Sequence, residues 1–171
     1  MKVHLRLDSG EDSDPASSAL PDDLLSAAGE VFASALAGFA PEAELPPEAE
    51  VSVTFLSPGE MREQNMLHRG LDEPTDVLSF PLWEEEGEFH PGRGMPVLPL
   101  GDIVICPEYI RDNLPPDKTF REEAALMLAH GFLHLIGWDH AEEAGEAAMT
   151  EAQEKLSQAL LDAAAGGRGE N

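Results

Sequence analysis

The sequence has few basic residues, only one cysteine and no long hydrophobic run. Ten lysine and arginine residues stand against 34 aspartate and glutamate residues, so the formal net charge is −24 over 171 residues. So acidic a surface repels nucleic acids and anionic membranes, unless its few arginines gather at one cleft. Cys106 has no partner for an internal disulfide, which indicates a reducing compartment. No stretch reaches the roughly 18 apolar residues of a membrane span, and the N-terminal residues lack the apolar run of a secretory signal.

What is present fits one folded domain. Hydrophobic residues make up 42% of the chain, a fraction well above that of disordered proteins. Roughly 100–200 residues make one ordinary domain, so a single core is expected. We predict one domain over residues 1–163 and a frayed tail over residues 164–171.

Hydrophobic periodicity predicts both strands and helices. Apolar residues that alternate with polar ones indicate strands, and apolar residues that recur every three to four positions indicate helices. Ser57 and Thr119 each begin a capping box, whereas Gly70 and Gly137 are placed to end helices. Residues 84–96 are acidic and rich in glycine and proline, which predicts a mobile loop. The expected strands cover 2–7, 51–56, 75–82 and 97–106, and the expected helices cover 21–38, 58–69, 107–113, 120–136 and 141–163.

The order of these elements predicts an α+β fold. They lack the regular strand–helix alternation of a parallel sheet, so we expect a mixed sheet of about four strands covered by helices. Pro81 limits its strand to an end or an edge of that sheet. The helix over residues 120–136 is apolar almost all the way round, which indicates that it is buried.

Three histidines follow one another at spacings typical of a metal site. His130 and His134 lie four residues apart, so a helix presents both rings on one face. Gly137 permits a left-handed turn that returns His140 to the same point. Three imidazoles leave the fourth position of a tetrahedral metal ion open, and open coordination is typical of catalytic rather than structural sites. We therefore predict a three-histidine metal site on a buried helix and the turn that follows it.

The same spacing occurs in metzincin proteases, with one decisive difference. Those enzymes carry a glutamate immediately after the first histidine as the general base. Here that position is Gly131, which has no side chain to take a proton. Ordinary metalloprotease chemistry is disfavoured for this reason.

Three ordered motifs resemble the YbeY family of single-strand-specific endoribonucleases, which are bacterial rRNA maturation factors. They are RGLDEPTDVLSFP at 69–81, LGDIVI at 100–105 and HGFLHLIGWDH at 130–140. The resemblance implies that His130, His134 and His140 bind one metal ion, generally taken as Zn²⁺. It also implies that Arg69 is an active-site residue, and a guanidinium is suited to clamp phosphate oxygens and stabilise developing charge. From the residues alone, Arg69 has a second interpretation, as a cation that complements the C-terminal end of a helix dipole.

Several neighbouring residues have two interpretations each. His68 is a candidate phosphate contact beside Arg69. Asp102 and Asp139 are candidates for supporting a histidine ligand, although Asp102 also suits a backbone contact and Asp139 a helix cap. Trp138 is suited to stack on a base or to pack in the core. Asp72, Thr75 and Asp76 are either turn caps or part of the cleft.

The function that the resemblance implies is metal-dependent cleavage of single-stranded RNA in the bacterial cytoplasm. The expected roles are 16S rRNA 3′-end processing and ribosome quality control, with no DNA or membrane partner. Water and the ribose 2′-hydroxyl both remain open as the attacking group. Because the chain is so acidic, we expect a local basic floor drawn from Arg69, Arg62, Arg111 and Arg121. We also expect weak affinity for free RNA and delivery by the ribosome or a ribosomal protein.

Two other function classes stay open at this point. One is a metalloprotease or another metallohydrolase, which the histidine spacing favours and Gly131 disfavours. The other is a non-enzymatic ribosome assembly factor whose metal is structural.

Overall fold

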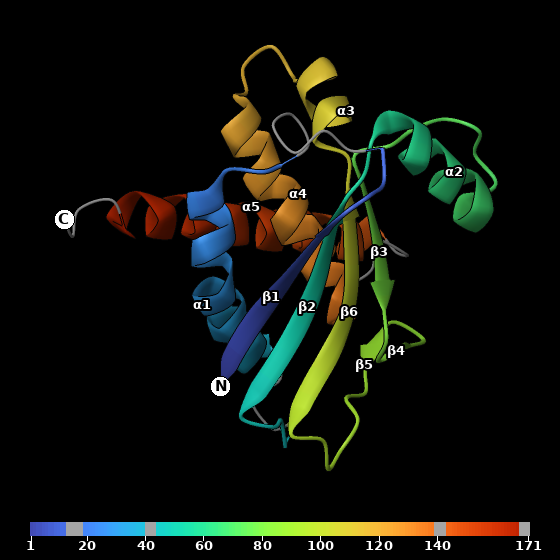
Figure 1. Cartoon of the computed structure of the whole chain (residues 1–171). Coiled ribbons are helices and arrows are strands. Elements are labelled where there is room, and N and C mark those ends of the chain that lie inside the picture. The colour runs from blue at the N-terminus through green and yellow to red at the C-terminus, as the bar shows by residue number, and fades with distance from the viewer. Residues whose placement is uncertain (13–18, 40–43, 139–142, 168–171) are drawn as a thin grey trace.

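The protein is described here from a computed structural model, which describes residues 1–12, 19–39, 44–138 and 143–167. A four-stranded sheet has the order β1-β2-β6-β3 (Figure 1). Strands β1 (Lys2–Ser9), β2 (Glu48–Phe55) and β6 (Val97–Ile105) are parallel, and β3 (Val77–Pro81) is antiparallel to β6. The mixed four-stranded sheet confirms the α+β prediction. Strand β3 lies at the edge and ends at Pro81, which agrees with the limit that proline imposes.

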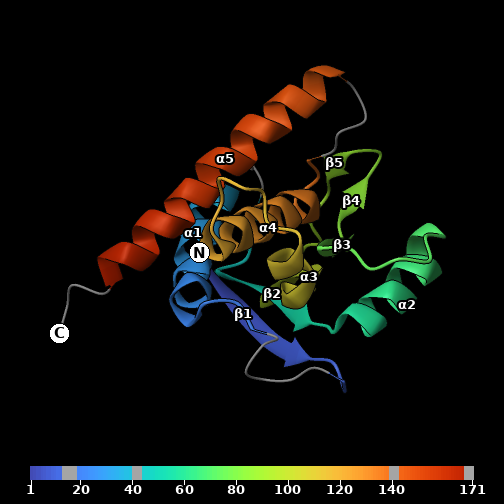
Figure 2. The ribbon, with the colours of Figure 1, turned by 90° about the horizontal axis from the view of Figure 1, so that it is seen from above.

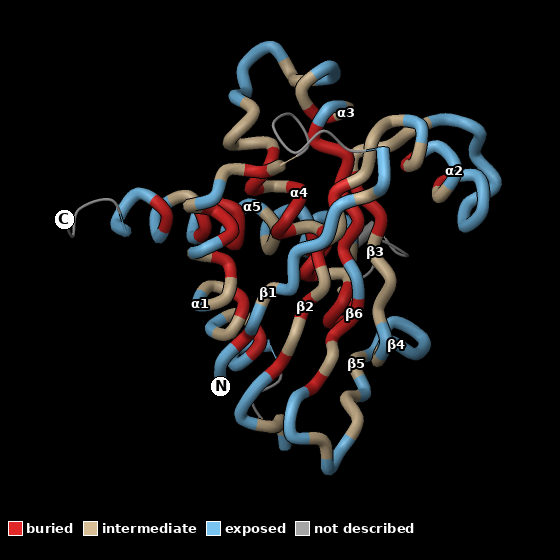
Figure 3. Tube along the Cα trace, in the orientation of Figure 1, coloured by how far each residue is buried: buried red, intermediate tan, exposed pale blue. Residues whose placement is uncertain are grey.

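Three helices form the layers behind the sheet. Helices α1 (Asp22–Phe39) and α4 (Phe120–Leu135) pack against strands, and α5 (Glu143–Gly166) crosses over both helices (Figure 2). The rings of Phe32 and Phe132 stack between α1 and α4 with their centroids 4.1 Å apart. Buried residues concentrate where α4 faces the sheet (Figure 3). Helix α4 thus lies in the core, as its apolar sequence predicts.

Local signals set the ends of the helices. Helix α2 (Pro58–Arg69) begins at the Ser57 capping box and ends at Gly70, whose φ of 72° is left-handed. Helix α4 begins at the Thr119 capping box. A short helix, α3 (Pro107–Asp112), follows β6. Both capping boxes and the glycine stop of α2 are confirmed.

The acidic loop expected over residues 84–96 contains a small hairpin instead. Strands β4 (Glu84–Glu85) and β5 (Glu88–Phe89) pair in antiparallel fashion. Glu86 and Gly87 join them with φ values of 55° and 80°, which suit the tight turn between two such strands. The prediction of a simple loop is therefore wrong for residues 84–89.

The last helix has bounds that differ from the predicted range 141–163. Helix α5 begins at Glu143 and continues to Gly166, and Ala164 on it is buried. Asp139, which was expected to cap this helix, lies outside the described residues. No helix in the described part of the chain is both long and apolar enough to cross a membrane.

Candidate active site

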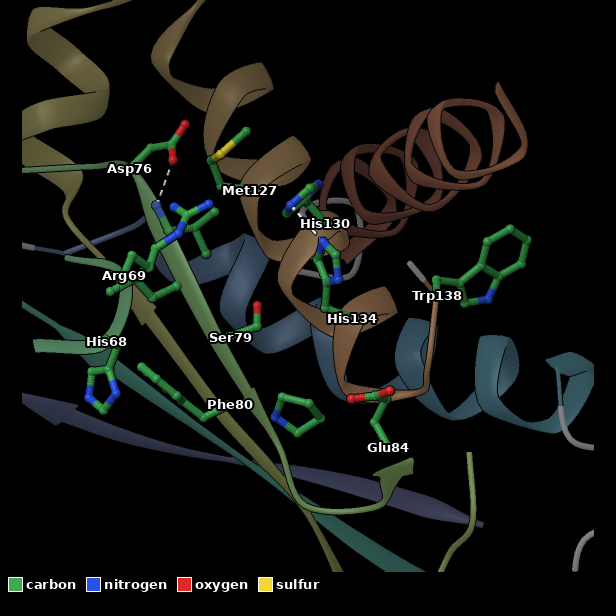
Figure 4. A pocket seen from close by; sticks show the side chains of 13 residues that line it. His68, Arg69, Asp76, Ser79, Phe80, Glu84, Met127, His130, His134 and Trp138 are labelled. Atoms are coloured by element: carbon green, nitrogen blue, oxygen red, sulfur yellow. Dashed lines mark hydrogen bonds between the residues drawn. The ribbon is translucent and has the colours of Figure 1, made fainter. Parts of the chain in front are cut away.

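Helix α4 brings His130 and His134 together on one side of a cleft (Figure 4). Their Nε2 atoms are 3.0 Å apart and their ring centroids 4.5 Å apart. Two nitrogen ligands of one tetrahedral zinc ion lie about 3.3 Å apart, because each is about 2.0–2.1 Å from the metal. The convergence of these two rings therefore fits a shared metal ion.

A residue of α5 contacts the outer side of this histidine pair. His130 Nδ1 lies 2.9 Å from Gln153 Oε1. An amide oxygen only accepts hydrogen bonds, so His130 Nδ1 is the donor in this contact. His130, His134 and Gln153 are all half-buried.

The third predicted ligand, His140, lies outside the described residues, as does Asp139. Within the described ranges, no group of three or more histidine, cysteine or acidic residues is placed to hold a metal. Cys106 is fully buried beside Met61, Leu78 and Val104, and burial raises the pKa of its thiol. The three-histidine set therefore stays a prediction, with two of its members juxtaposed.

Arg69 and His68 form the opposite wall of the cleft, which has a volume of about 590 Å³. Both residues stand in the last turn of α2, just before the left-handed Gly70. In the described part of the chain, Arg69 has no carboxylate within ion-pair distance. The ring of His68 packs against that of Phe80, with centroids 4.6 Å apart. Across the cleft, the guanidinium of Arg69 thus faces the histidine pair and remains available to bind an anion.

Strand β3 runs along the floor between the two walls. Asp76, Ser79 and Phe80 line the cleft from this strand and the residue before it (Figure 4). Asp76 Oδ1 accepts hydrogen bonds from the Val77 amide at 2.7 Å and from the Thr75 hydroxyl at 3.2 Å. Asp76 therefore acts as a cap and also borders the cleft, so both interpretations of this residue describe it.

Asp72 has a different role from Asp76. Its two carboxylate oxygens accept hydrogen bonds from Arg62 at 2.8 and 2.9 Å. This contact lowers the pKa of Asp72 and raises that of Arg62. Both side chains point to solvent on the outer part of α2 and its following turn, so they stabilise this segment rather than the cleft.

The expected basic floor is much smaller than predicted. Of the four arginines considered, only Arg69 lines the cleft. Arg62 is held by Asp72, and Arg121 forms a 2.7 Å ion pair with Asp23. Arg111 donates to the Ala19 carbonyl and lies over the Phe120 ring. Sequence spacing could not reveal these partners, because each pair joins distant or separately folded segments.

Gly131 is a packing residue on the sheet side of α4. A Cβ at this position would lie 2.7 Å from Cγ2 of Ile103, which is itself fully buried. The position after the first histidine therefore has no room for a carboxylate. The nearest acidic residue N-terminal to the pair on α4 is Glu123, about two turns away, where burial and then Asp76 raise its pKa.

The remaining predicted residues are placed as follows. Asp102 is exposed on β6 and is not among the residues that line the cleft. Trp138 borders the cleft and also packs against Phe39, with ring centroids 5.6 Å apart. Among the residues that we did not single out from the sequence, Gln153 and Glu84 reach the site from α5 and the β4–β5 hairpin. No spacing signal marks them, because each arrives through tertiary packing.

Comparisons with known proteins agree with the three sequence motifs at 69–81, 100–105 and 130–140. Residues 22–161 match the family described as Endoribonuclease YbeY. The protein of that name from Shouchella clausii is 44% identical over 124 residues, which cover 70% of this chain and 77% of the relative. The one from Geobacillus kaustophilus is 45% identical over 115 residues, which cover 66% and 73%. The solution structure of TM1509 from Thermotoga maritima aligns with a TM-score of 0.53 and 27% identity, and covers 98% of this chain and 96% of its own.

Proposed function

The chain belongs to the YbeY endoribonuclease family, and from this premise we propose that it is a metal-dependent endoribonuclease of single-stranded RNA. We propose that it acts in 16S rRNA 3′-end maturation and ribosome quality control. One observation carries the proposal. Two converging histidine Nε2 atoms, 3.0 Å apart, face Arg69 across one open cleft. This arrangement supports phosphodiester chemistry, because the scissile phosphate needs both charge neutralisation and a positioned donor.

We propose that His130, His134 and His140 hold a zinc ion at the α4 wall. Imidazole nitrogens are suitable zinc ligands, and the separation of the two described Nε2 atoms supports this choice. A zinc ion there supplies Lewis acidity toward a phosphoryl oxygen or a water molecule. The chain itself orients the ligands and keeps the phosphate-facing side of the cleft open.

In this proposal, Arg69 binds the phosphate of the substrate. A guanidinium donates two parallel hydrogen bonds to phosphate oxygens and does not lose its charge at physiological pH. Its position at the end of α2 leaves it exposed, so it reaches a strand that enters from solvent. The bonds strengthen as charge develops on the oxygens, which favours the transition state over the bound substrate.

The aromatic lining of the cleft favours a single strand. The ring of Phe80, backed by His68, and the ring of Trp138 line the cleft. Bases that are unstacked from their neighbours pack on such rings, whereas bases inside a duplex already stack on one another. We therefore propose that paired RNA is a poor substrate.

The charge of the molecule supports delivery by the ribosome or a ribosomal protein. The net charge is −24, and Arg69 is the one arginine that lines the cleft in the described residues. Neutralising few phosphates releases few counterions, so affinity for naked RNA is weak and depends little on salt. For one or two phosphate contacts, the slope of log K against log salt is about −0.7 to −1.4.

The test uses zinc-loaded protein and an RNA that carries the 3′ end of the 16S precursor, alone or annealed to its complement. We expect cleavage of the single strand, slower cleavage of the duplex, and no cleavage by His130→Ala. A 2′,3′-cyclic phosphate on the product identifies attack by the 2′-hydroxyl, and a linear phosphate with no cyclic intermediate identifies attack by water. Equal cleavage of both RNAs contradicts the single-strand preference.

Adding Arg69→Ala and a peptide substrate to this experiment separates the other two function classes. A non-enzymatic assembly factor with a structural metal cleaves neither RNA, and Arg69→Ala then changes nothing. A metalloprotease cleaves an unstructured peptide library instead. That class has the weaker support, because its general base position is Gly131 packed against Ile103.

A further inference from the structure

We propose that Gln153 is a positioning residue that fixes His130 in the tautomer required for metal binding. The proposal rests on the metal site proposed above. It concerns a residue of α5 that touches neither the ion nor the RNA and acts only through His130. Its basis is the 2.9 Å contact between His130 Nδ1 and Gln153 Oε1.

Gln153 occupies an unusual place on its helix. Met149, Leu156 and Leu160 are buried residues of α5 at positions that share one helical face with Gln153. This face packs against α4 and α1. A polar amide in an apolar stripe is expected to have a hydrogen-bond partner, and His130 is the partner in this structure. The amide is therefore held at the back of the ring by the packing of two helices.

The contact selects one of the two neutral forms of His130. Because Oε1 only accepts, the favoured form carries its hydrogen on Nδ1 and exposes the Nε2 lone pair. The 3.0 Å contact between the two histidines is consistent with this form, since His134 Nε2–H then donates to His130 Nε2 in metal-free protein. The three side chains thus form one directed chain of hydrogen bonds, which ends at Gln153.

A neutral amide is well suited to this position. Metal-binding histidines commonly donate their second ring nitrogen to a carbonyl or carboxylate, which orients the ring and strengthens the ligand. A carboxylate would do the same but would add a negative charge to a chain that already carries −24. It would also change its protonation with pH, whereas the amide does not.

The first measurement needs no substitution. Nitrogen-15 NMR of histidine-labelled, metal-free protein reports which ring nitrogen of His130 carries the hydrogen. We expect the Nδ1–H form for His130. A predominant Nε2–H form overturns the proposal, whether or not the protein binds zinc.

The second measurement compares variants of two glutamines on α5. In Gln153→Leu the acceptor is removed, in Gln153→Glu an acceptor is retained, and in Gln158→Leu an exposed contact with Asp162 is removed far from the cleft. We expect Gln153→Leu to lose the preference for the Nδ1–H form and to bind zinc about 10- to 100-fold more weakly in a chelator competition. Gln153→Glu restores most of the affinity, and Gln158→Leu matches the parent protein.

The outcomes separate this proposal from the proposed function. Parent-like tautomer and zinc affinity in Gln153→Leu overturn the role of Gln153 and leave the endoribonuclease proposal intact. Failure of the parent protein to bind zinc overturns the metal-dependent function, while the tautomer of His130 still decides the role of Gln153. If Gln153→Leu does not fold, the parent spectrum and the Gln153→Glu variant provide the answer.

Discussion

The α4 wall of the cleft is part of the core, whereas the α2 wall stands at the surface. Helix α4 packs against β3, β6 and α5, and its Phe132 stacks on Phe32 of α1. Helix α2 instead leaves large apolar side chains in solvent, with exposed fractions of 52% for Met66 and 73% for Leu67. The histidine pair is therefore held by packing and a hydrogen bond, but Arg69 is held mainly by the helix end that carries it. One wall supplies fixed geometry, and the other supplies accessible charge.

Removing a histidine from the fixed wall is the most severe test of this comparison. We expect His130→Ala or His134→Ala to abolish stoichiometric zinc and to reduce RNA cleavage by about a thousandfold or more, since a metal ion contributes several kcal/mol to such reactions. Metal content is measured by elemental analysis and cleavage by initial rates. Full activity in a zinc-free variant would show that the wall does not hold a catalytic metal.

Removing the charge from the exposed wall should affect catalysis but not folding. Arg69→Ala is expected to lower the cleavage rate by about 10²- to 10³-fold, the usual effect of deleting one donor to a developing anion. Its thermal midpoint and zinc content should match the parent, because Arg69 is exposed and forms no ion pair in the described residues.

Arg62→Ala is the matched control on the same helix. Arg62 is exposed and bound to Asp72 away from the cleft. This variant should retain the parent cleavage rate. A loss equal to that of Arg69→Ala would indicate that α2 as a whole, rather than one guanidinium, serves the substrate.

The packing of the fixed wall is tested at Gly131. A methyl group there would meet Ile103 at 2.7 Å, and overpacking a core costs about 1–3 kcal/mol. Alanine also gains up to about 1 kcal/mol of helix propensity over glycine, so we expect Gly131→Ala to lower the free energy of unfolding by about 1 kcal/mol. Chemical denaturation measures this change. A more stable variant would mean that α4 can move away from β6 at no cost.

The smallest expected effect concerns Glu123, where α4 approaches Asp76. Burial, and then Asp76, raise the pKa of Glu123 above its ordinary value of 4.5. Its native state therefore favours the protonated form, and this contribution to stability is lost as pH rises through the raised pKa. Glu123→Gln should increase the thermal midpoint slightly at pH 7, and the difference should vanish below pH 4.5. An unchanged midpoint at every pH would contradict the burial of this carboxylate.

Local features of the fold could be predicted because local chemistry determines them. Ser57 and Thr119 each form a capping box with the glutamate three residues later. Gly70 ends α2 because glycine adopts a left-handed conformation without strain. The β4–β5 hairpin was missed because its strands have two residues each and are mostly glutamate. The turn needs positive φ at Glu86 and Gly87, and of these two residues glycine alone favours that conformation.

The site could be predicted only as far as chain-neighbouring residues define it. His130 and His134 share a helix face, so their spacing alone was sufficient to bring them together. The partners of Arg111 and Arg121 lie 92 and 98 residues away, and Gln153 reaches His130 through the contact of α4 with α5. Such pairs depend on how the helices pack, which periodicity does not specify.

The order of residues along the chain has a consequence for biosynthesis. Gln153 follows His130 by 23 positions and lies on a helix that the ribosome makes after α4. Helix α4 is therefore synthesised before the helix that covers its histidine pair and orients His130. Premature termination between α4 and α5 would yield a fragment that keeps both imidazoles on one helix face but lacks the amide that orients His130.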